Sequence, residues 1–236
     1  MRRSFALLAL LIGTAVRAAT GAPNFLFILV DDQSWSGTSV AMVRGQDSSR
    51  TAGFRMPNLD RLAVEGMVFS QAYAAHPKCE CSRAAIQMGR TTTSLNAVEK
   101  RARQWSAPPS DSLVNTLKRA NAAYRAAHFG KWQWPTAPAA FGYDASDGVT
   151  QNEDGDTTDA SDPKQSFSIT RRAEAFMARQ VKDGHPFYLQ LSYYAVHQRP
   201  QALASTLRAY GSGGGAVFAA MTEDLDTCIG SLRRTL

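Results

Sequence analysis

The residues best suited to chemistry lie between Pro77 and Arg90. Cys79 stands just before a short helix expected over residues 82–88, and Arg83 follows four residues later. The first N–H groups of a helix have no partner within the helix, and a nearby guanidinium adds positive charge. Both features favour an anion, and the thiolate is the reactive form of cysteine. The spacing therefore marks Cys79 as a position where a negative charge is favoured.

Two adjacent carboxylates, Asp31 and Asp32, follow directly after the apolar run Phe25–Val30. A run without polar alternation predicts a central strand of a parallel sheet, covered on both faces. Adjacent carboxylates at the end of a buried strand repel each other, and a hard divalent cation coordinated by oxygen would remove that repulsion. The alternative is a turn or helix-capping pair, which is common after strands.

Three further polar side chains follow other predicted strands. Lys131 and Gln133 come just after a strand expected over residues 124–129, and His197 comes after a strand expected over residues 187–191. Parallel sheets bind ligands at the carboxyl ends of their strands, so these positions are candidates for a binding site. A solvated lysine and a histidine that caps a loop are the simpler interpretations.

Strands alternate with helices along the chain, which predicts an α/β fold with a mostly parallel sheet flanked by helices. A further strand is expected over Val68–Tyr73, after a helix for which Asn58 is the expected N-cap. The length of 236 residues suffices for one large domain or two small ones. The other expected helices cover residues 111–123, 169–182 and 218–232, and residues 143–166, rich in Asp, Ser, Thr and Gly, are expected to form a solvated loop.

The N-terminus resembles a secretory signal. Arg2 and Arg3 precede the apolar run Phe5–Val16, which is short for a membrane span, and small residues follow it. The pattern predicts a signal peptide over residues 1–19, with a membrane anchor as the alternative. We therefore expect an exported protein, periplasmic or secreted, without stable membrane association.

Charge and cysteine content limit the classes of partner. The formal charge of +6 includes three arginines within residues 1–18, and the other basic residues are scattered, so no nucleic-acid partner is expected. Cys79 and Cys81 are too close for an ordinary disulfide, and no second cysteine pair would complete a tetrahedral metal site. Cys228 lies on the apolar side of a helical pattern and is expected to be a small core residue.

Five features, in this order, resemble the type I sulfatases of the alkaline-phosphatase-like superfamily. They are the pair Asp31–Asp32, the motif Cys79–Arg83, the segment Gly130–Trp132, the histidine His197 after a strand, and the Glu-Asp-Leu-Asp helix at Glu223–Asp226. The resemblance covers residues 23–236 and implies the N-terminal catalytic domain of a sulfatase.

The resemblance also implies cofactors and residue roles. In that family the motif cysteine is oxidised to formylglycine by a formylglycine-generating enzyme, which implies this modification at Cys79. It further implies a divalent metal, Ca²⁺ in preference to Mg²⁺, held by Asp31, Asp32 and the side chain at Cys79. The residues with an implied catalytic role are Cys79, Arg83, Lys131 and His197, and those implied to contact the sulfate are Lys131, Gln133 and His197.

The sequence departs from the family pattern in several places, one of which is that Pro200 comes one residue later after His197 than the family's proline. Cys81 stands where the family has proline, and Gln133 stands where it has histidine. The strand ending in Asp-Asn-Gly that follows the last helix in the family, and the smaller domain after it, have no counterpart, so we expect a C-terminally truncated domain. The implied function is hydrolysis of sulfate monoesters, carbohydrate sulfates among them. The alternatives are a phosphodiester or phosphonate hydrolase of the same superfamily and an inactive remnant.

Overall fold

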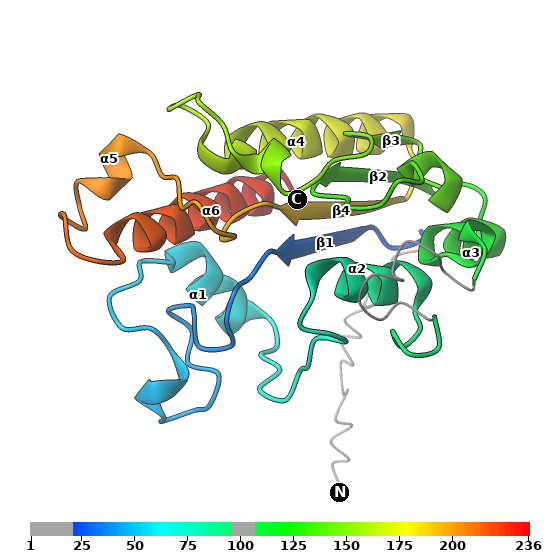
Figure 1. Ribbon diagram of the computed structural model, residues 1–236. Helices are drawn as coiled ribbons and strands as arrows, with labels where there is room; N and C mark the ends of the chain where they lie inside the picture. Colours follow the sequence, from blue (N-terminus) through cyan, green and yellow to red (C-terminus); the bar gives the residue numbers. More distant parts are fainter. Residues whose placement is uncertain (1–20, 96–106) are drawn as a thin grey trace, which may run out of the picture.

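The computed structural model describes residues 21–95 and 107–236, so the expected signal peptide lies outside the described residues. Its centre is a four-stranded sheet in the order β1-β4-β2-β3 (Figure 1), and all its strand pairs are parallel. This arrangement confirms the predicted α/β class. The strands are β1 (Phe25–Val30), β2 (Arg125–Gly130), β3 (Ala145–Ser146) and β4 (Phe187–Tyr193).

Helices cover both faces of this sheet (Figure 1). The α-helices in the described ranges are α1 (Pro57–Glu65), α2 (Cys79–Met88), α3 (Leu113–Ala120), α4 (Ser166–Asp183), α5 (Ala204–Leu207) and α6 (Ala216–Thr235). One apolar cluster joins α4 and α6 to the sheet, and a second joins α2 and α3 to the opposite face. None of the helices in the described ranges is both long and apolar enough to cross a bilayer.

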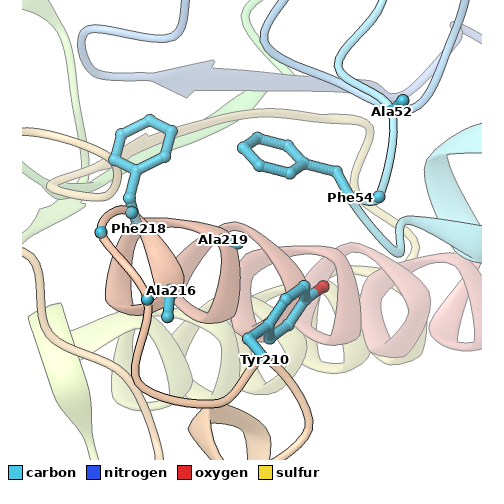
Figure 2. A pocket seen from close by; sticks show the side chains of 10 residues that line it. Ala52, Phe54, Tyr210, Ala216, Phe218 and Ala219 are labelled. Atoms are coloured by element: carbon cyan, nitrogen blue, oxygen red, sulfur yellow. The ribbon is translucent and has the colours of Figure 1, made fainter.

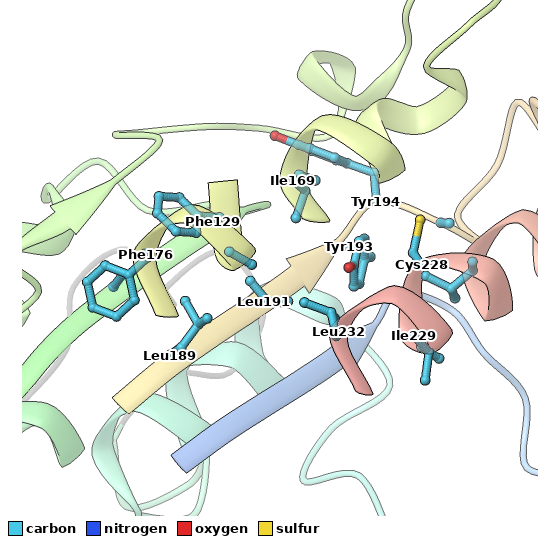
Figure 3. Close-up of a cluster of buried hydrophobic side chains, with 14 of the residues drawn as sticks. Phe129, Ile169, Phe176, Leu189, Leu191, Tyr193, Tyr194, Cys228, Ile229 and Leu232 are labelled. Carbon is cyan, nitrogen blue, oxygen red and sulfur yellow. The ribbon is translucent and has the colours of Figure 1, made fainter. Parts of the chain in front are cut away.

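The central strand β4 is buried along its whole length, and its two faces differ in polarity. Leu189, Leu191 and Tyr193 point into the apolar cluster with α4 and α6 (Figure 3). Gln190 and Ser192 lie between them in sequence, so they belong to the opposite face, where both are buried and hydrogen-bonded to other side chains. The sheet therefore has an apolar face and a face that carries buried polar groups.

The last helix confirms the predicted apolar stripe and also fixes the start of α1. The carboxylate of Asp226 on α6 accepts hydrogen bonds from the backbone N–H groups of Asn58 and Leu59, at 3.1 and 2.8 Å. The N-cap of α1 is Met56, so the prediction of Asn58 as N-cap was wrong. Asn58 lies in the first turn, and a residue 168 positions away in sequence supplies the capping oxygen.

Two other predictions about strands were wrong. β1 was expected in the middle of the sheet, but it lies at an edge, and none of its six residues is fully buried. The expected strand over Val68–Tyr73 is irregular in the structure, because strand structure requires a neighbouring strand to pair with. The loop predicted over residues 143–166 contains the short strand β3, which pairs with β2.

Candidate active site at the carboxyl end of the sheet

Asp31 is the first residue after β1 and is buried at the carboxyl end of the sheet. Its carboxylate accepts hydrogen bonds from Lys131 Nζ and from Arg83 Nη2, the latter over 3.3 Å. The side chain of Arg83 is 3% exposed and that of Lys131 0% exposed, so water screens these charges little. One carboxylate thus faces two cations, and the positive charge left over favours an anion beside them.

Burial affects the guanidinium of Arg83 directly. Loss of hydration lowers the pKa of Arg83, and the negative charge of Asp31 opposes that shift. An arginine starts from so high a value that it keeps its proton at physiological pH. The site therefore holds a permanent positive charge, which suits an anionic substrate.

The close approach of β2 to β4 sets the position of Lys131. Its backbone N–H donates to the Ser192 carbonyl at 2.8 Å, and its own carbonyl accepts from Arg83 Nη1 at 2.6 Å. Gly130 precedes it with φ +96°, and a Cβ there would lie 2.1 Å from the Ser192 oxygen. Only glycine fits this position, and the backbone turn that it allows brings the Lys131 ammonium group to the Asp31 carboxylate.

Cys79 begins α2 and is half-buried. Its sulfur accepts a hydrogen bond from Gln133 Nε2 at 3.2 Å, and the same nitrogen lies 3.2 Å from Asn152 Oδ1. Gln133 has φ 75°, a left-handed conformation, and its N–H donates to the Thr150 carbonyl at 2.8 Å. The glutamine that stands in place of the family histidine therefore contacts the sulfur directly.

The loops after β1 and β4 are joined by two backbone hydrogen bonds. Asp31 N–H donates to the Ala195 carbonyl at 3.0 Å, and Val196 N–H donates to the Asp31 carbonyl at 2.8 Å. This pairing brings His197 Nε2 to 3.6 Å from Asp32 Oδ2. Asp32 has φ 58°, which aspartate tolerates better than most residues. Its side chain is 55% exposed, so its carboxylate remains available to a ligand.

A cavity of about 250 Å³ gathers most of these side chains. Asp31, Asp32, Cys79 and Arg83 line it, together with Gln33. The residues that line this cavity thus come to one edge of the sheet from two separate segments of the chain, residues 29–33 and 74–86.

Three predicted site residues, Lys131, Gln133 and His197, do not line this cavity. Gln133 contacts the sulfur of Cys79, which does line it. Lys131 lies beneath Asp31, to which it is hydrogen-bonded. His197 lines a smaller cavity of about 100 Å³, with Asn152 and Arg199 among its walls. The Asp32–His197 contact and the Gln133–Asn152 contact connect the two cavities.

The oxygen-bearing side chains at the site are of the kind that binds a hard divalent cation, and they supply part of its coordination shell. Asp31 and Asp32 offer two carboxylates to the same cavity, and the side-chain oxygen of Gln33 there is buried without a hydrogen-bond partner. Such cations take six to eight oxygen ligands. The described part of the chain contains no group of three His, Cys, Asp or Glu side chains placed to hold a metal.

Sequence reasoning missed several residues at or behind the site. Asn152 lies in the segment expected to be a solvated loop, and Gln33 follows the aspartate pair without a motif of its own. Gln87 on α2 donates to Gln190 on β4 at 2.8 Å, and the Tyr143 hydroxyl lies 2.9 Å from both amide oxygens. This buried network ties α2 to the sheet, and it had no local sequence signal because its members are far apart in the chain.

A further cavity, of about 370 Å³, lies elsewhere and shares no lining residue with the two described above (Figure 2). The rings of Phe54, Tyr210 and Phe218 surround it, and Gly213–Gly215 form part of its wall. The glycine-rich stretch forms a turn before α6.

Comparisons with known proteins agree with the geometry. The family model described as Sulfatase matches residues 23–236. N-acetylgalactosamine-6-sulfatase of Sus scrofa is 37% identical over 131 residues, which is 51% of this chain and 23% of that protein. The Homo sapiens enzyme of the same name is 35% identical over 130 residues, again 51% of this chain and 23% of that protein.

Solved structures resemble most of the chain. A crystal structure of Ps i-CgsB in complex with k-i-k-neocarrahexaose has a TM-score of 0.71 at 23% identity, covering 91% of this chain and 55% of that one. The PsFucS1 sulfatase from Pseudoalteromonas sp. has a TM-score of 0.67 at 20% identity, covering 91% and 52%. The structure of BT4656 in complex with its substrate D-glucosamine-2-N,6-O-disulfate has a TM-score of 0.60 at 22% identity, covering 80% of this chain and 37% of that one.

These likenesses establish the fold and, through the family model, the family. The chain spans about half the length of the first two of those solved relatives and a smaller share of the curated ones. With the family model matched from residue 23 to residue 236, this chain belongs to the sulfatase family, whose alkaline-phosphatase-like fold it shares.

Proposed function

We propose that this chain carries the nucleophile-bearing part of a sulfuric ester hydrolase that acts on carbohydrate sulfates. The observation that carries the proposal is the group of two buried cations around a single carboxylate, beside a cavity that also contains Cys79. Such a group favours an anionic ester. Relatives named for N-acetylgalactosamine 6-sulfate and a solved relative bound to a disulfated glucosamine support a sugar sulfate as the substrate class.

In this proposal each residue of the site has a separate role. Arg83 holds a sulfate oxygen and offsets the negative charge that develops as the ester bond breaks, because its guanidinium presents paired donors. Lys131 holds the Asp31 carboxylate in place by a hydrogen bond and adds a second positive charge to the site. Gln133 orients the side chain at position 79 through its 3.2 Å contact. His197 lines the neighbouring smaller cavity and protonates the departing alcohol.

Two groups would be added to these residues. A side chain at Cys79 converted to hydrated formylglycine supplies two hydroxyls on one carbon, so that one can attack sulfur and the other can expel sulfate. Asp31, Asp32 and the side chain at position 79 would hold a Ca²⁺ or Mg²⁺ ion, which would supply further positive charge to an anionic ester. Asp32, exposed and free of a strong cation partner, is the ligand most open to it.

The proposal includes export to the periplasm or beyond and maturation by a formylglycine-generating enzyme. The chain would be co-expressed with that enzyme, and the peptide containing Cys79 would be analysed by mass spectrometry. The matured protein would be assayed with p-nitrophenyl sulfate, with N-acetylgalactosamine 6-sulfate and with bis(p-nitrophenyl) phosphate in the presence of Ca²⁺. We expect conversion at Cys79, sulfate ester hydrolysis, and loss of both in Cys79→Ala.

The outcomes separate the alternatives. Faster turnover of the phosphate diester would favour a phosphodiesterase of the same superfamily. An unmodified thiol and no turnover of any ester would favour an inactive remnant. As a further check, Arg83→Gln is expected to reduce kcat by roughly a hundredfold or more, since it removes a charged donor from the developing negative charge.

A further inference from the structure

Lys131 and Gln133 lie in a short irregular turn, Gly130–Gln133, at the end of β2. Residues 131–133 belong to neither a helix nor a strand, and Gly130 and Gln133 have left-handed backbone conformations, with φ of 96° and 75°. A glutamine keeps such a conformation only where its surroundings hold it there. The hydrogen-bond partners of the turn's peptide groups therefore decide where the Lys131 and Gln133 side chains point.

One residue of another loop, Thr150, is hydrogen-bonded to three peptide groups of this turn. Its hydroxyl donates to the Gly130 carbonyl at 2.7 Å and accepts from the Trp132 N–H at 2.9 Å. Its own carbonyl accepts from the Gln133 N–H at 2.8 Å. Because a hydroxyl can donate and accept at once, the Thr150 side chain joins the peptide group before Lys131 to the peptide group after it.

The other end of each of these two peptide groups is bound to a regular element of the fold. The N–H of Lys131 donates to the Ser192 carbonyl on β4 at 2.8 Å, and the Lys131 carbonyl accepts from Arg83 Nη1 on α2 at 2.6 Å. The Thr150 hydroxyl supplies a partner for the carbonyl of the first peptide group and for the N–H of the second. The backbone is therefore held at both ends of each peptide group that flanks Lys131.

Two residues close to this threonine in sequence hold the same turn. The Asp147 carboxylate accepts from the Gly130 N–H at 2.7 Å, and the Asn152 amide oxygen accepts from Gln133 Nε2 at 3.2 Å. The same Asp147 oxygen accepts from Arg172 Nη2 at 2.9 Å, which ties the loop to the long helix α4. The segment Asp147–Asn152 is therefore fixed along the turn, although its composition indicates only a solvated loop.

We propose that Thr150 is a positioning residue of the candidate active site. Its hydroxyl holds the backbone on both sides of Lys131 and thereby directs the Lys131 ammonium group to the Asp31 carboxylate, with which that group is hydrogen-bonded. Its carbonyl holds the Gln133 backbone in the conformation from which the Gln133 amide contacts the Cys79 sulfur at 3.2 Å. The expected effect on turnover rests on the proposed function, whereas the expected effect on Lys131 rests on the contacts alone.

A double-mutant cycle in the full chain tests this coupling without any enzyme assay. Thr150→Val keeps the shape of the side chain but removes the hydroxyl, so the turn loses two hydrogen bonds. Displacement of the turn also weakens the Lys131–Asp31 contact, and Lys131→Met lacks that contact from the start. We therefore expect Thr150→Val to lower the midpoint of urea unfolding in EDTA at least about twice as much in the wild-type background as in Lys131→Met. A threonine with a purely structural role would give equal shifts in both backgrounds.

Thr170→Val is the matched control. Thr170 on α4 is 4% exposed, and its hydroxyl also has two partners, the Ser166 carbonyl and the Tyr193 hydroxyl, each at 2.7 Å. None of these three residues lines either cavity of the site. Thr170→Val should therefore lower the midpoint by the same amount with and without Lys131→Met. Thr150→Ala is the second variant if Thr150→Val does not fold, and the same difference between the two backgrounds is expected for it.

Enzyme kinetics give a second readout. In the matured protein with Ca²⁺ and p-nitrophenyl sulfate, Thr150→Val should lower kcat by roughly tenfold or more and change KM less, because small displacements of positioned groups slow the chemical step. Thr150→Ser keeps the hydroxyl and should stay within about twofold of the wild-type kcat, and so should Thr170→Val.

Three results would overturn the proposal. They are equal midpoint shifts in the two backgrounds, an unchanged kcat in Thr150→Val, and a Thr150→Ser variant as impaired as Thr150→Val. If the wild-type chain hydrolyses no ester at all, the proposed function fails, but the midpoint shifts still decide whether Thr150 positions Lys131.

Discussion

Replacement of Asp31 by asparagine tests whether one carboxylate balances two buried cations. Asn keeps the size of the side chain and one oxygen acceptor, so Asp31→Asn creates no cavity and removes only the negative charge. Arg83 and Lys131 would then remain 3% and 0% exposed without a counter-charge. Removal of one partner from a buried ion pair costs about 3–5 kcal/mol. We expect the lower part of that range, because Arg83 keeps its hydrogen bond to the Lys131 carbonyl.

The measurement is urea unfolding of the full chain in EDTA, since a bound divalent cation would itself stabilise the native state. A loss of about 3 kcal/mol shifts the midpoint by on the order of 1 M urea or more. The matched control is Asp47→Asn, which breaks the Arg50–Asp47 pair, with side chains 42% and 90% exposed. That variant should lose about 0–1 kcal/mol.

A double variant separates charge from packing. Adding Lys131→Met to Asp31→Asn removes one of the two uncompensated cations, so we expect the double variant to be more stable than Asp31→Asn alone. If Asp31→Asn loses no more than Asp47→Asn, or if the added change lowers stability further, the description of the site as a charge-coupled buried group is wrong.

Three other predictions follow from the site and its surroundings. Burial lowers the pKa of His128 from 6.5 to about 3, so below pH 6.5 the unfolded chain binds a proton at this residue and the folded protein does not. The free energy of unfolding is therefore expected to fall as the pH drops below 6.5. His128→Leu should reduce the slope of that fall by about 1.4 kcal/mol per pH unit, measured by urea titrations at several pH values. Gly130→Ala should destabilise the folded protein by more than about 2 kcal/mol, because the added Cβ would clash with the Ser192 carbonyl oxygen. Gly148→Ala is the control: Gly148 also has a positive φ but has open space around it, so the change should cost about 1 kcal/mol. Asp226→Asn should lower the thermal midpoint through a loss of about 1–2 kcal/mol, since it weakens the cap on α1, and an unchanged midpoint would contradict that role.

The elements that surround the site could be predicted from sequence because their signals are local. The apolar stripe of α6 repeats at helical spacing, and Gly89 ends α2 in the left-handed conformation typical of a C-cap. The candidate residues Asp31, Lys131 and His197 all follow strands, and parallel strands bring such positions to one edge of the sheet. Their proximity therefore follows from topology, without knowledge of any side-chain contact.

The features that could not be predicted depend on partners far away in the chain. The segment Val68–Tyr73 has strand propensity, but propensity alone does not supply a neighbour. Asp226 caps a helix through Asn58, which lies 168 residues earlier, and nothing near either residue indicates the pairing. Asn152 contacts Gln133 from a loop whose composition indicates only solvation. In each case the choice of partner is a tertiary event.

The structure also shows why cysteine can replace the family proline at position 81. Cys81 is the third residue of α2, its exposed fraction is 0%, and it belongs to the apolar cluster beneath the helix. In the first turn of a helix the backbone N–H has no intrahelical acceptor, so loss or gain of that N–H leaves the helix start unchanged. The side chain points into the core, whereas Cys79 lines the cavity. The substitution is therefore compatible with the folded site, and any effect on formylglycine formation would arise where the maturation enzyme reads the motif as a peptide.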